Sequence, residues 1–263
     1  MRSKSFFSAT RVTVIAMFSA LAGVLYVFGF PIASAFPFWL ELNFSDIPAL
    51  IGAFAMGPVS GSLIVFFKII IKLVIKGTST TFVGELADLV IGIAFVLPAA
   101  LIYKKKRTIK GAVVGMAVGT VASIAMSILA NWLVLVPFYL QLFFKGSWTP
   151  LVSAMQGLFG EGCTQETFYN FYLWASVLPF NAMRCLIAVA VTLPVYKHIS
   201  RLINKMHAKL DPKRVESDDP EEEARLQRAE RKRTAIIIGV TCAVIALLVV
   251  GVVLRYYIPI WTA

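Results

Sequence analysis

Residues 42–98 read LNFSDIPALIGAFAMGPVSGSLIVFFKIIIKLVIKGTSTTFVGELADLVIGIAFVLP, and this is the most informative stretch of the chain. Its hydrophobic runs carry six charged residues that a simple membrane anchor would not keep: Asp46, Lys68, Lys72, Lys76, Glu85 and Asp88. An ionisable side chain near hydrocarbon costs several kcal/mol unless it is paired or faces a water-filled cavity. We therefore predict a helix bundle in the membrane that handles a polar solute.

The composition of the whole chain supports an integral membrane protein. Of its 263 residues, 59% are hydrophobic and 15% are charged, whereas soluble domains average about 45–50% apolar and about 25% charged residues. The net charge of +11 comes from basic residues between hydrophobic runs, as in cytoplasmic loops, so no nucleic-acid partner is expected. The three cysteines are far apart and predict neither a disulfide framework nor a metal site.

Seven hydrophobic runs are candidate spans, since a spanning helix needs about 20 apolar residues. Their approximate ranges are 11–30, 46–57, 58–76, 84–103, 111–140, 171–199 and 234–257. The second run is too short to cross alone. Gly57-Pro58 separates it from the third, because proline lacks an amide donor and clashes with the preceding turn. We expect an all-α, polytopic membrane protein with a six-helix bundle and one extra C-terminal transmembrane helix.

The distribution of basic residues predicts the orientation. Lysine and arginine gather at the N-terminus, in residues 103–110 and in residues 197–214, whereas the loops 31–45, 77–83 and 141–170 contain only Lys145 as a base. The positive-inside rule therefore predicts a multi-pass protein of the cell membrane with a cytoplasmic N-terminus. We divide the chain into a six-helix domain (1–207), a charged cytoplasmic linker (208–233) and an additional helix with a short extracellular tail (234–263).

The sequence contains no motif typical of an enzyme. We find no His/Glu metal motif, no nucleophile elbow and no phosphate-binding glycine-rich loop with its lysine, and both His198 and His207 lie in basic stretches. Glu85 and Asp88 are three residues apart and share a helix face, so cation binding or a carboxylate dyad stays open. For Glu85 we favour a position at the helix start that complements the helix dipole, with ligand contact as an additional role.

Several polar residues map to the outward side of the predicted bundle. Asn131 lies in the outer half of one run, and Asn181 and Arg184 share a face of another. Asparagine can serve only as a link between helices, and arginine can clamp a carboxylate. Because Glu41, Asn43 and Asp46 map to the same side, we predict one outward-facing polar cup. Lys72, too central to extend to the interface, is predicted beside it, paired with Asp46, Glu85 or Asp88.

Four segments carry a family resemblance: LELNFSDIPALIGAFAMGPVSG, IKLVIKGTSTTFVGELADLVIGIAFVLPAALIYKKKRTIKGAVVG, ANWLVLVPFY and LPFNAMR. In this order they resemble the riboflavin-specific substrate-binding (S) component of energy-coupling factor (ECF) vitamin transporters, over roughly residues 8–200. The resemblance implies a six-helix S-component fold that binds the vitamin from the outside. It also implies two kinds of partner, a transmembrane coupling subunit and two cytoplasmic ATPases. We find no ATPase motif in the chain itself.

The resemblance also implies roles for particular residues. Ala16 and Ala20 match the family's small-residue contact with the coupling subunit, and the loop around residues 41–46 closes over the ligand. The family more usually has lysine where Arg184 stands, and an arginine fork is not equivalent to an ammonium. The predicted substrate-binding residues are Glu41, Leu42, Asn43, Asp46, Lys72, Thr78, Glu85, Asn131, Asn181 and Arg184. The predicted apolar walls are Phe38, Trp39, Leu42, Phe44, Val83 and Leu86.

We expect no cofactor and no metal: riboflavin is the transported ligand, and ATP is used only by the partner subunits. The alternative is a standalone secondary carrier for a flavin or another small polar vitamin, although no inverted repeat or pair of broken helices is evident. An intramembrane enzyme lacks a convincing base and nucleophile, and a structural scaffold leaves the gathered polar residues unexplained.

Overall fold

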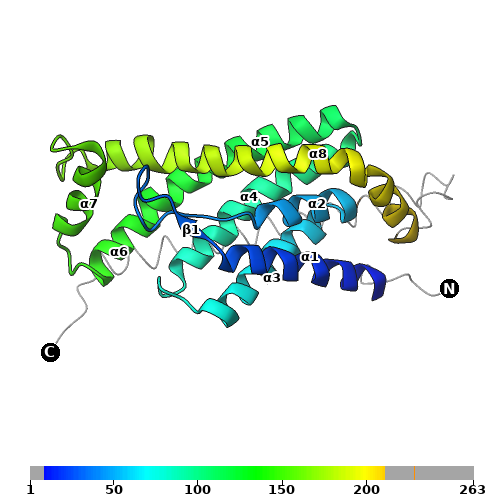
Figure 1. Cartoon of the computed structure of the whole chain (residues 1–263), viewed down its shortest axis with the longest axis horizontal. Helices are drawn as coiled ribbons and strands as arrows, with labels where there is room; N and C mark the ends of the chain where they lie inside the picture. The colour runs from blue at the N-terminus through cyan, green and yellow to red at the C-terminus, as the bar shows by residue number, and fades with distance from the viewer. Residues whose placement is uncertain (1–8, 211–227, 229–263) are drawn as a thin grey trace.

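The computed structural model describes residues 9–210 and residue 228. Within residues 9–210 the chain is mostly helical, and the longest helices run side by side along the long axis of the molecule (Figure 1). The elements are α1 (Ala9–Val27), β1 (Phe30–Pro31), β2 (Glu41–Leu42), α2 (Asp46–Met56), α3 (Pro58–Lys76), α4 (Val83–Lys105), α5 (Ile109–Ala130), η1 (Asn131–Leu135), α6 (Val136–Leu142), α7 (Thr149–Phe159), η2 (Asn170–Val177) and α8 (Leu178–Leu210).

Six helical rods account for most of this region, because some elements are continuous. α5, the π-helical segment η1 and α6 follow one another without a break, and so do the π-helical segment η2 and α8. The predicted runs within residues 9–210 all coincide with these rods to within a few residues, apart from the C-terminal extension of α8. The predicted linker and seventh helix lie outside the described residues.

Gly57 and Pro58 separate α2 from α3, as predicted. Gly57 has φ +91°, a conformation that favours glycine, and Pro58 occupies the first turn of α3. That position suits proline because the first turn leaves its backbone amides without intrahelical partners. The short α2 packs against α3 and α8, so Asp46 at its N-terminus is carried into the centre of the bundle.

A stripe of small residues lets α5 approach α4 closely. Gly111, Gly115 and Gly119 recur every four residues on one face of α5, and all three are buried. A Cβ atom at Gly115 would lie 2.6 Å from the carbonyl oxygen of Ala99, and one at Gly119 would lie 2.3 Å from that of Phe95. Only glycine permits this backbone contact. The close approach of the two helices is therefore encoded by the spacing.

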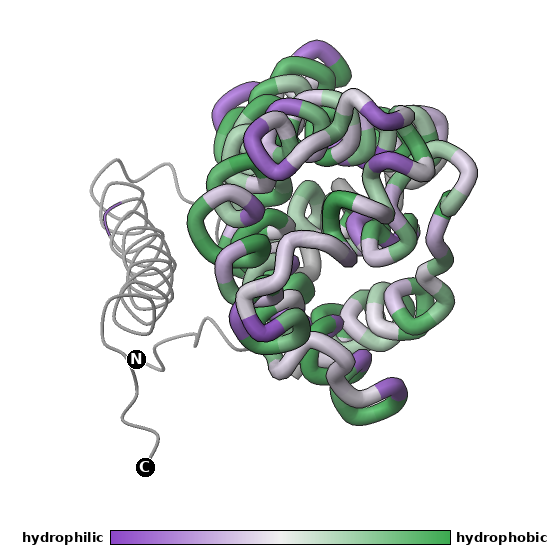
Figure 2. The backbone as a smooth tube through the Cα atoms, turned by 90° about the vertical axis from the view of Figure 1, so that its left-hand side faces the viewer, coloured by the Kyte–Doolittle hydropathy of each residue, from purple (hydrophilic) through white to green (hydrophobic). Residues whose placement is uncertain are grey.

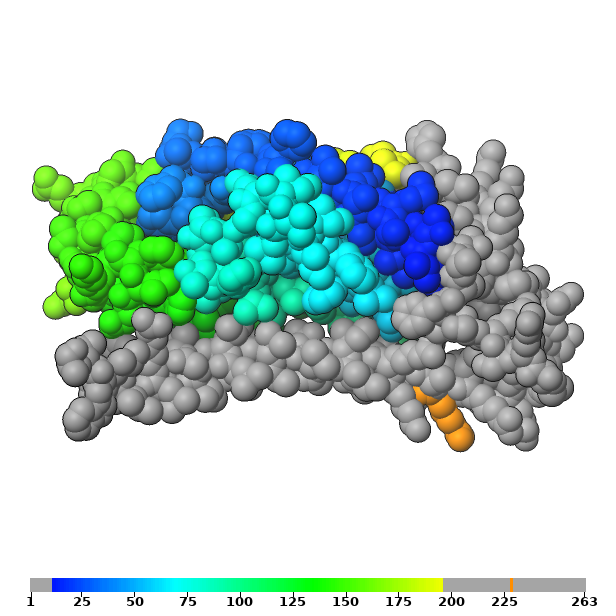
Figure 3. Space-filling model, turned by 90° about the horizontal axis from the view of Figure 1, so that it is seen from below, coloured from blue at the N-terminus to red at the C-terminus, as the bar shows by residue number. Residues whose placement is uncertain are grey.

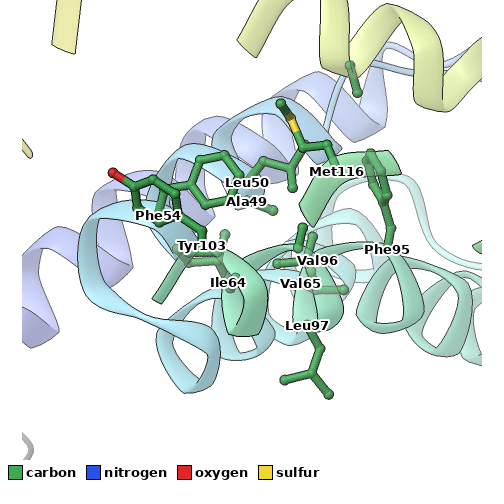
Figure 4. Close-up of a cluster of buried hydrophobic side chains, with 14 of the residues drawn as sticks. Ala49, Leu50, Phe54, Ile64, Val65, Phe95, Val96, Leu97, Tyr103 and Met116 are labelled. Atoms are coloured by element: carbon green, nitrogen blue, oxygen red, sulfur yellow. The ribbon is translucent and has the colours of Figure 1, made fainter. Parts of the chain in front are cut away.

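The main apolar core lies where α2, α3, α4 and α5 meet. Figure 4 shows side chains from these four helices converging there: Ala49, Leu50, Phe54, Ile64, Val65, Phe95, Val96, Leu97, Tyr103 and Met116. Phe54 and Tyr103 are in ring contact, with centroids 4.6 Å apart. Because this core fills one end of the bundle, an interior cavity can form only towards the other end.

That other end is built by α6, α7, η2 and the long loop between α1 and α2. A second, aromatic-rich cluster packs Leu151 and Met155 of α7 against Phe168 and Tyr172. In the loop, β1 and β2 form a two-residue antiparallel ribbon, with Phe30 opposite Leu42. The loop (blue) lies next to the green segment that contains α6 and α7 (Figure 3). The helix α7 was not predicted from the sequence.

The outer surface fits a membrane. Four helical stretches are long and apolar enough to cross a bilayer, namely Pro58–Lys76, Val83–Lys105, Ile109–Leu142 and Asn170–Val195, and two shorter apolar helices accompany them. Large apolar side chains point outward, among them Met17, Val74 and Val121. Seen along the bundle, stretches of hydrophobic residues (green) occur on every side of the described helices (Figure 2). The prediction of an all-α, polytopic membrane protein is confirmed.

Candidate functional site

A cavity of about 520 Å³ lies between the α1–α2 loop, the helix ends and the two π-helical segments. Charged, amide and aromatic side chains line it together, which is the usual make-up of a small-molecule site. Its polar lining includes Glu41, Asn43, Lys72, Lys76, Thr78, Thr80, Glu85, Asp88, Ser127, Asn131, Asn181 and Arg184. Its apolar and aromatic lining includes Tyr26, Phe38, Trp39, Ile91, Leu135, Val136, Tyr139, Phe143, Phe168, Tyr172 and Phe180.

Lys72 and Glu85 form one charged wall of this cavity. Lys72 donates to Glu85 Oε1, and the other carboxylate oxygen of Glu85 accepts hydrogen bonds from Thr78 (3.0 Å) and Thr80 (2.7 Å). Both ionic side chains are almost fully buried. Pairing and these extra hydrogen bonds offset part of the cost of removing two charges from water. Lys72 is therefore paired with Glu85, one of its three predicted partners. Glu85 lies in the first turn of α4, as predicted, and also lines the cavity.

Arg184 anchors a second charged group beneath the cavity. Its Nη2 atom lies 3.1 Å from Asp46 Oδ2, and its Nη1 atom lies 3.8 Å from Asp88 Oδ1. The other oxygen of Asp46 receives Lys68 Nζ at 2.6 Å. Asp88 in turn accepts a hydrogen bond from the Tyr26 hydroxyl of α1. The arginine thus clamps carboxylates between helices and also lines the cavity.

The two amides stand next to each other because both bond to Ser127. Asn131 Nδ2 donates to the carbonyl oxygen of Ser127 at 2.9 Å. Asn181 Nδ2 donates to the Ser127 hydroxyl at 2.6 Å and to the carbonyl oxygen of Val177 at 2.9 Å. Both asparagines are buried and face the cavity. Their carbonyl and N–H groups can read the hydrogen-bonding edge of a planar heterocycle.

Aromatic rings enclose the rest of the cavity. The Trp39 indole N–H donates to the Tyr172 hydroxyl at 3.1 Å, which joins the α1–α2 loop to η2. Phe168 stacks on Tyr172 with ring centroids 5.3 Å apart. Flat aromatic walls favour a flat aromatic ligand, because such rings bury a large area in a defined geometry.

Lys76 and Glu41 stand at the mouth of the cavity. Their side chains lie 3.2 Å apart and are each 42% exposed. The pair joins the C-terminal end of α3 to β2 in the α1–α2 loop. An exposed pair of this kind contributes about 0–1 kcal/mol to stability, so it can break without cost to the fold.

Most of the predicted substrate-binding residues lie around this cavity. Glu41, Asn43, Lys72, Thr78, Glu85, Asn131, Asn181 and Arg184 belong to its lining. The lining does not include Leu42, which is buried in the ribbon, or Asp46, which lies behind Arg184. Of the predicted apolar walls, Phe38 and Trp39 line the cavity, whereas Leu42, Phe44, Val83 and Leu86 do not.

Several lining residues were not predicted from the sequence, chiefly Tyr26, Ser127, Tyr139, Tyr172 and Phe180. Ser127 lies four residues before Asn131 and could have been placed on the same helix face from that spacing. The aromatic residues carry no such signal, because aromatic side chains are common on every face of a membrane helix bundle.

Ala16 and Ala20 lie away from the cavity, on the exposed face of α1. Val12, Met17, Leu21 and Val24 are exposed beside them. The opposite face of α1 packs into the bundle through Ile15, Ala22 and Gly23, and a Cβ atom at Gly23 would lie 2.5 Å from Ile71 of α3. The helix therefore has one packed face and one exposed face.

Membrane-length helices around a polar and aromatic cavity define a class, the membrane proteins that bind a small solute. Residues 10–196 match the family model described as "ECF transporter, substrate-specific component". The chain belongs to this family of transporter components, which confirms the predicted S-component fold and the prediction that the protein is not an enzyme.

Named relatives and a solved structure agree with this assignment. The Riboflavin transporter FmnP of Bacillus subtilis (strain 168) is 35% identical over 131 residues, which are 49% of this chain and 68% of the relative. The Riboflavin transporter RibU of Staphylococcus aureus (strain TCH60) is 28% identical over 196 residues, or 74% of this chain and 93% of the relative. A solved S component of a bacterial ECF transporter superposes with a TM-score of 0.54 at 26% identity, covering 73% of this chain and 96% of that one.

Proposed function

We propose that this chain is the riboflavin-binding S component of an ECF-type importer. It captures riboflavin from outside the cell and releases it inward when a transmembrane coupling subunit and two ATPases act on it. The observation that carries the proposal is the cavity itself, where paired asparagine amides, Arg184 and the Lys72–Glu85 pair share one space with Trp39, Phe168 and Tyr172. The names of the two relatives support riboflavin as the ligand.

The chemistry of the lining fits the parts of the vitamin. The tricyclic ring system needs flat apolar walls, which the aromatic side chains supply. Its pyrimidine edge alternates carbonyl and N–H groups, which the two amides complement. The ribityl hydroxyls both donate and accept hydrogen bonds, so the threonines and charged pairs near the mouth suit them. The site residues we propose are Glu41, Leu42, Asn43, Asp46, Lys72, Thr78, Glu85, Asn131, Asn181 and Arg184, with Leu42 and Asp46 supporting the lining.

The orientation follows from the charge pattern. Lys104, Lys105, Lys106 and Arg107 lie at the end of α4, opposite the cavity end of the bundle. The positive-inside rule places this end, and with it the N-terminus, in the cytoplasm. The cavity then opens towards the outside of the cell.

A binding titration on the purified full-length chain in detergent tests the proposal. Riboflavin fluorescence should be quenched on binding with a stoichiometry of one per chain, because stacking against aromatic rings quenches the flavin. Competition with thiamine, biotin, pyridoxine and folate should leave the bound riboflavin in place. Absence of quenching, or displacement by an unrelated vitamin at equal concentration, would contradict riboflavin as the ligand.

A further inference from the structure

The cavity contains a chain of hydrogen bonds that the proposed function does not use. The Trp39 indole N–H donates to the Tyr172 hydroxyl (3.1 Å), and that hydroxyl donates to Asn131 Oδ1 (2.8 Å). The three residues come from the α1–α2 loop, η2 and η1. Tyr172 is 3% exposed and Asn131 is 4% exposed, so water does not compete freely for these bonds.

The bond from Tyr172 fixes which way the Asn131 amide faces. An asparagine amide offers an oxygen and an NH₂ group of nearly equal size, and its hydrogen bonds decide the orientation. The Asn131 side-chain oxygen accepts a hydrogen bond from the Tyr172 hydroxyl, and its nitrogen uses one of its two hydrogens to donate to the carbonyl oxygen of Ser127. One N–H of Asn131 is left for the cavity.

Asn181 has the complementary arrangement. Both hydrogens of its amide nitrogen are used, one by the Ser127 hydroxyl and one by the carbonyl oxygen of Val177. Its oxygen is therefore the group that it can offer to a ligand. Ser127 holds the two amides next to each other, so a donor at Asn131 stands beside an acceptor at Asn181.

We propose that Tyr172 is a positioning residue for ligand recognition: it locks the Asn131 amide with an N–H towards the cavity, so that the site selects a carbonyl group next to an N–H. This deepens the proposed function and rests on it, since the imide edge of riboflavin has that pattern. Without the tyrosine hydroxyl, the Asn131 amide is free to turn its oxygen towards the ligand carbonyl. Two acceptors would then face each other.

A double-mutant cycle tests this role. Riboflavin affinity is measured for the unmodified full-length chain, Tyr172→Phe, Asn131→Ala and the double variant. The loss of one hydrogen bond that orients a ligand-contacting group predicts a roughly 3- to 10-fold weaker affinity for Tyr172→Phe. In the Asn131→Ala background the same change should alter affinity less than about twofold, because the group that Tyr172 positions is already gone.

Tyr139→Phe is the matched control. Tyr139 also lines the cavity, but its hydroxyl lies beside Gly84 and Thr80, at the start of α4. Whatever effect this substitution has should be the same in both backgrounds. A tyrosine that only fills space or touches the ligand directly would likewise behave additively, so an equal effect of Tyr172→Phe in both backgrounds overturns the proposal.

Two further readouts separate the other outcomes. Thermal unfolding checks that the Tyr172→Phe variant is folded. If it is not folded, the double-mutant cycle is run with Trp39→Phe in its place, because this substitution removes the indole N–H that donates to the Tyr172 hydroxyl. Unchanged riboflavin affinity in a folded Tyr172→Phe variant contradicts the positioning role of Tyr172 but not the proposed function. No riboflavin binding by the unmodified chain contradicts the proposed function, and the positioning role fails with it.

Discussion

Asp46 shows how contacts of a single residue offset the free-energy cost of burying charges inside the helix bundle. It is 1% exposed, yet its two oxygens meet Lys68 at 2.6 Å and Arg184 at 3.1 Å. Lys68 also donates to the Ser45 hydroxyl at 2.8 Å. A buried ion is costly unless its partner and its remaining hydrogen-bonding groups are supplied. Here each charge has an ion-pair partner, although Arg184 Nε is buried without a hydrogen-bond partner among the described residues. The network joins the start of α2 to the cavity floor.

Lys72 and Lys76 allow a matched test of this argument. Lys72→Met would leave Glu85 buried without its cation, and breaking a buried pair costs about 3–5 kcal/mol. Lys76→Met removes an exposed pair and should change stability by about 0–1 kcal/mol. Thermal unfolding in detergent should therefore show a much lower midpoint for Lys72→Met than for Lys76→Met. Equal midpoints would mean that the buried pair does not stabilise the bundle.

Asn131→Ala and Arg184→Ala test the recognition residues. Each removes a group that the proposed ligand contacts, and an unsatisfied buried polar partner costs about 1–3 kcal/mol. Riboflavin affinity should fall by roughly 5- to 150-fold in each variant. Arg184→Ala should also lower the unfolding temperature, because Asp46 loses a cation. Affinity unchanged in both variants would remove these residues from the site.

The charged and amide residues of the site could be predicted from the sequence because each is expensive in a membrane. That cost made Lys72, Asn131 and Arg184 conspicuous, and all three line the cavity. Lys68 was noted as a charged residue but was not predicted to have a partner, and it is 3% exposed and bonded to Asp46. Tyr26 and Tyr172 gave no signal, because a tyrosine in a hydrophobic run is as common at an interface as in a site.

At the scale of the element, one stripe of residues on α5 and η1 combines helix packing with the lining of the cavity. Small and polar residues recur there every four positions, and all are buried: Gly111, Gly115, Gly119, Ser123, Ser127 and Asn131. At about 100° per residue, each step of four positions turns the stripe by about 40° around the helix. The stripe therefore winds from the contact with α4, where Gly115 and Gly119 lie, to the cavity, which Ser127 and Asn131 line.

Gly119→Ala tests the packing part of this stripe. The added Cβ atom would lie 2.3 Å from a backbone oxygen of α4, so the helices must separate, and overpacking of this kind costs about 1–3 kcal/mol. Gly157→Ala is the control, because no atom lies within 4 Å of a Cβ atom there. The unfolding temperature should fall for Gly119→Ala and hold or rise slightly for Gly157→Ala. A similar result for both would contradict close packing of α4 on α5.

The π-helical segments explain what helix periodicity could not predict. Tyr172 and Asn181 are nine residues apart, and at about 100° per residue a regular α-helix would place them on opposite faces. η2 is wider than an α-helix and changes this phase, so both residues reach the cavity. π-helical turns occur often at functional sites. The helix α7 was missed for a different reason, because its 11 residues are too few for a span.

The molecule as a whole separates its functions along its length. The cavity occupies one end, the apolar core fills the other, and the exposed face of α1 runs beside both. One protein can then hold a solute at one end while a partner touches its side. Tyr26 joins the two regions, because it lies on the buried face of α1 and donates to Asp88 in the cavity lining.

Ala16→Trp and Ala20→Trp test whether a partner uses the face of α1. Small residues four apart allow another helix to approach closely, and a tryptophan would block that approach without touching the cavity. Both variants should bind riboflavin as the unmodified chain does. In proteoliposomes that contain the coupling subunit and the ATPases, their ATP-dependent uptake should fall at least about tenfold, since even 1.4 kcal/mol of lost contact energy weakens assembly by that factor. Val121→Trp, on the 69% exposed Val121 of α5, should leave uptake intact.

The same proteoliposomes distinguish the importer from a standalone carrier. Without the coupling subunit and the ATPases, the chain alone should bind riboflavin but accumulate none, because ligand binding by itself supplies no energy for movement against a gradient. Uptake by the chain alone, unaffected by ATP, would favour a carrier. If instead the tryptophan variants lose uptake together with Val121→Trp, the bulk of the side chain in the membrane, and not a contact at Ala16 and Ala20, is responsible. If uptake is lost only in the Ala16 and Ala20 variants and riboflavin binding is preserved, the exposed face of α1 is the surface that contacts the coupling subunit and links ATP hydrolysis to transport of the ligand.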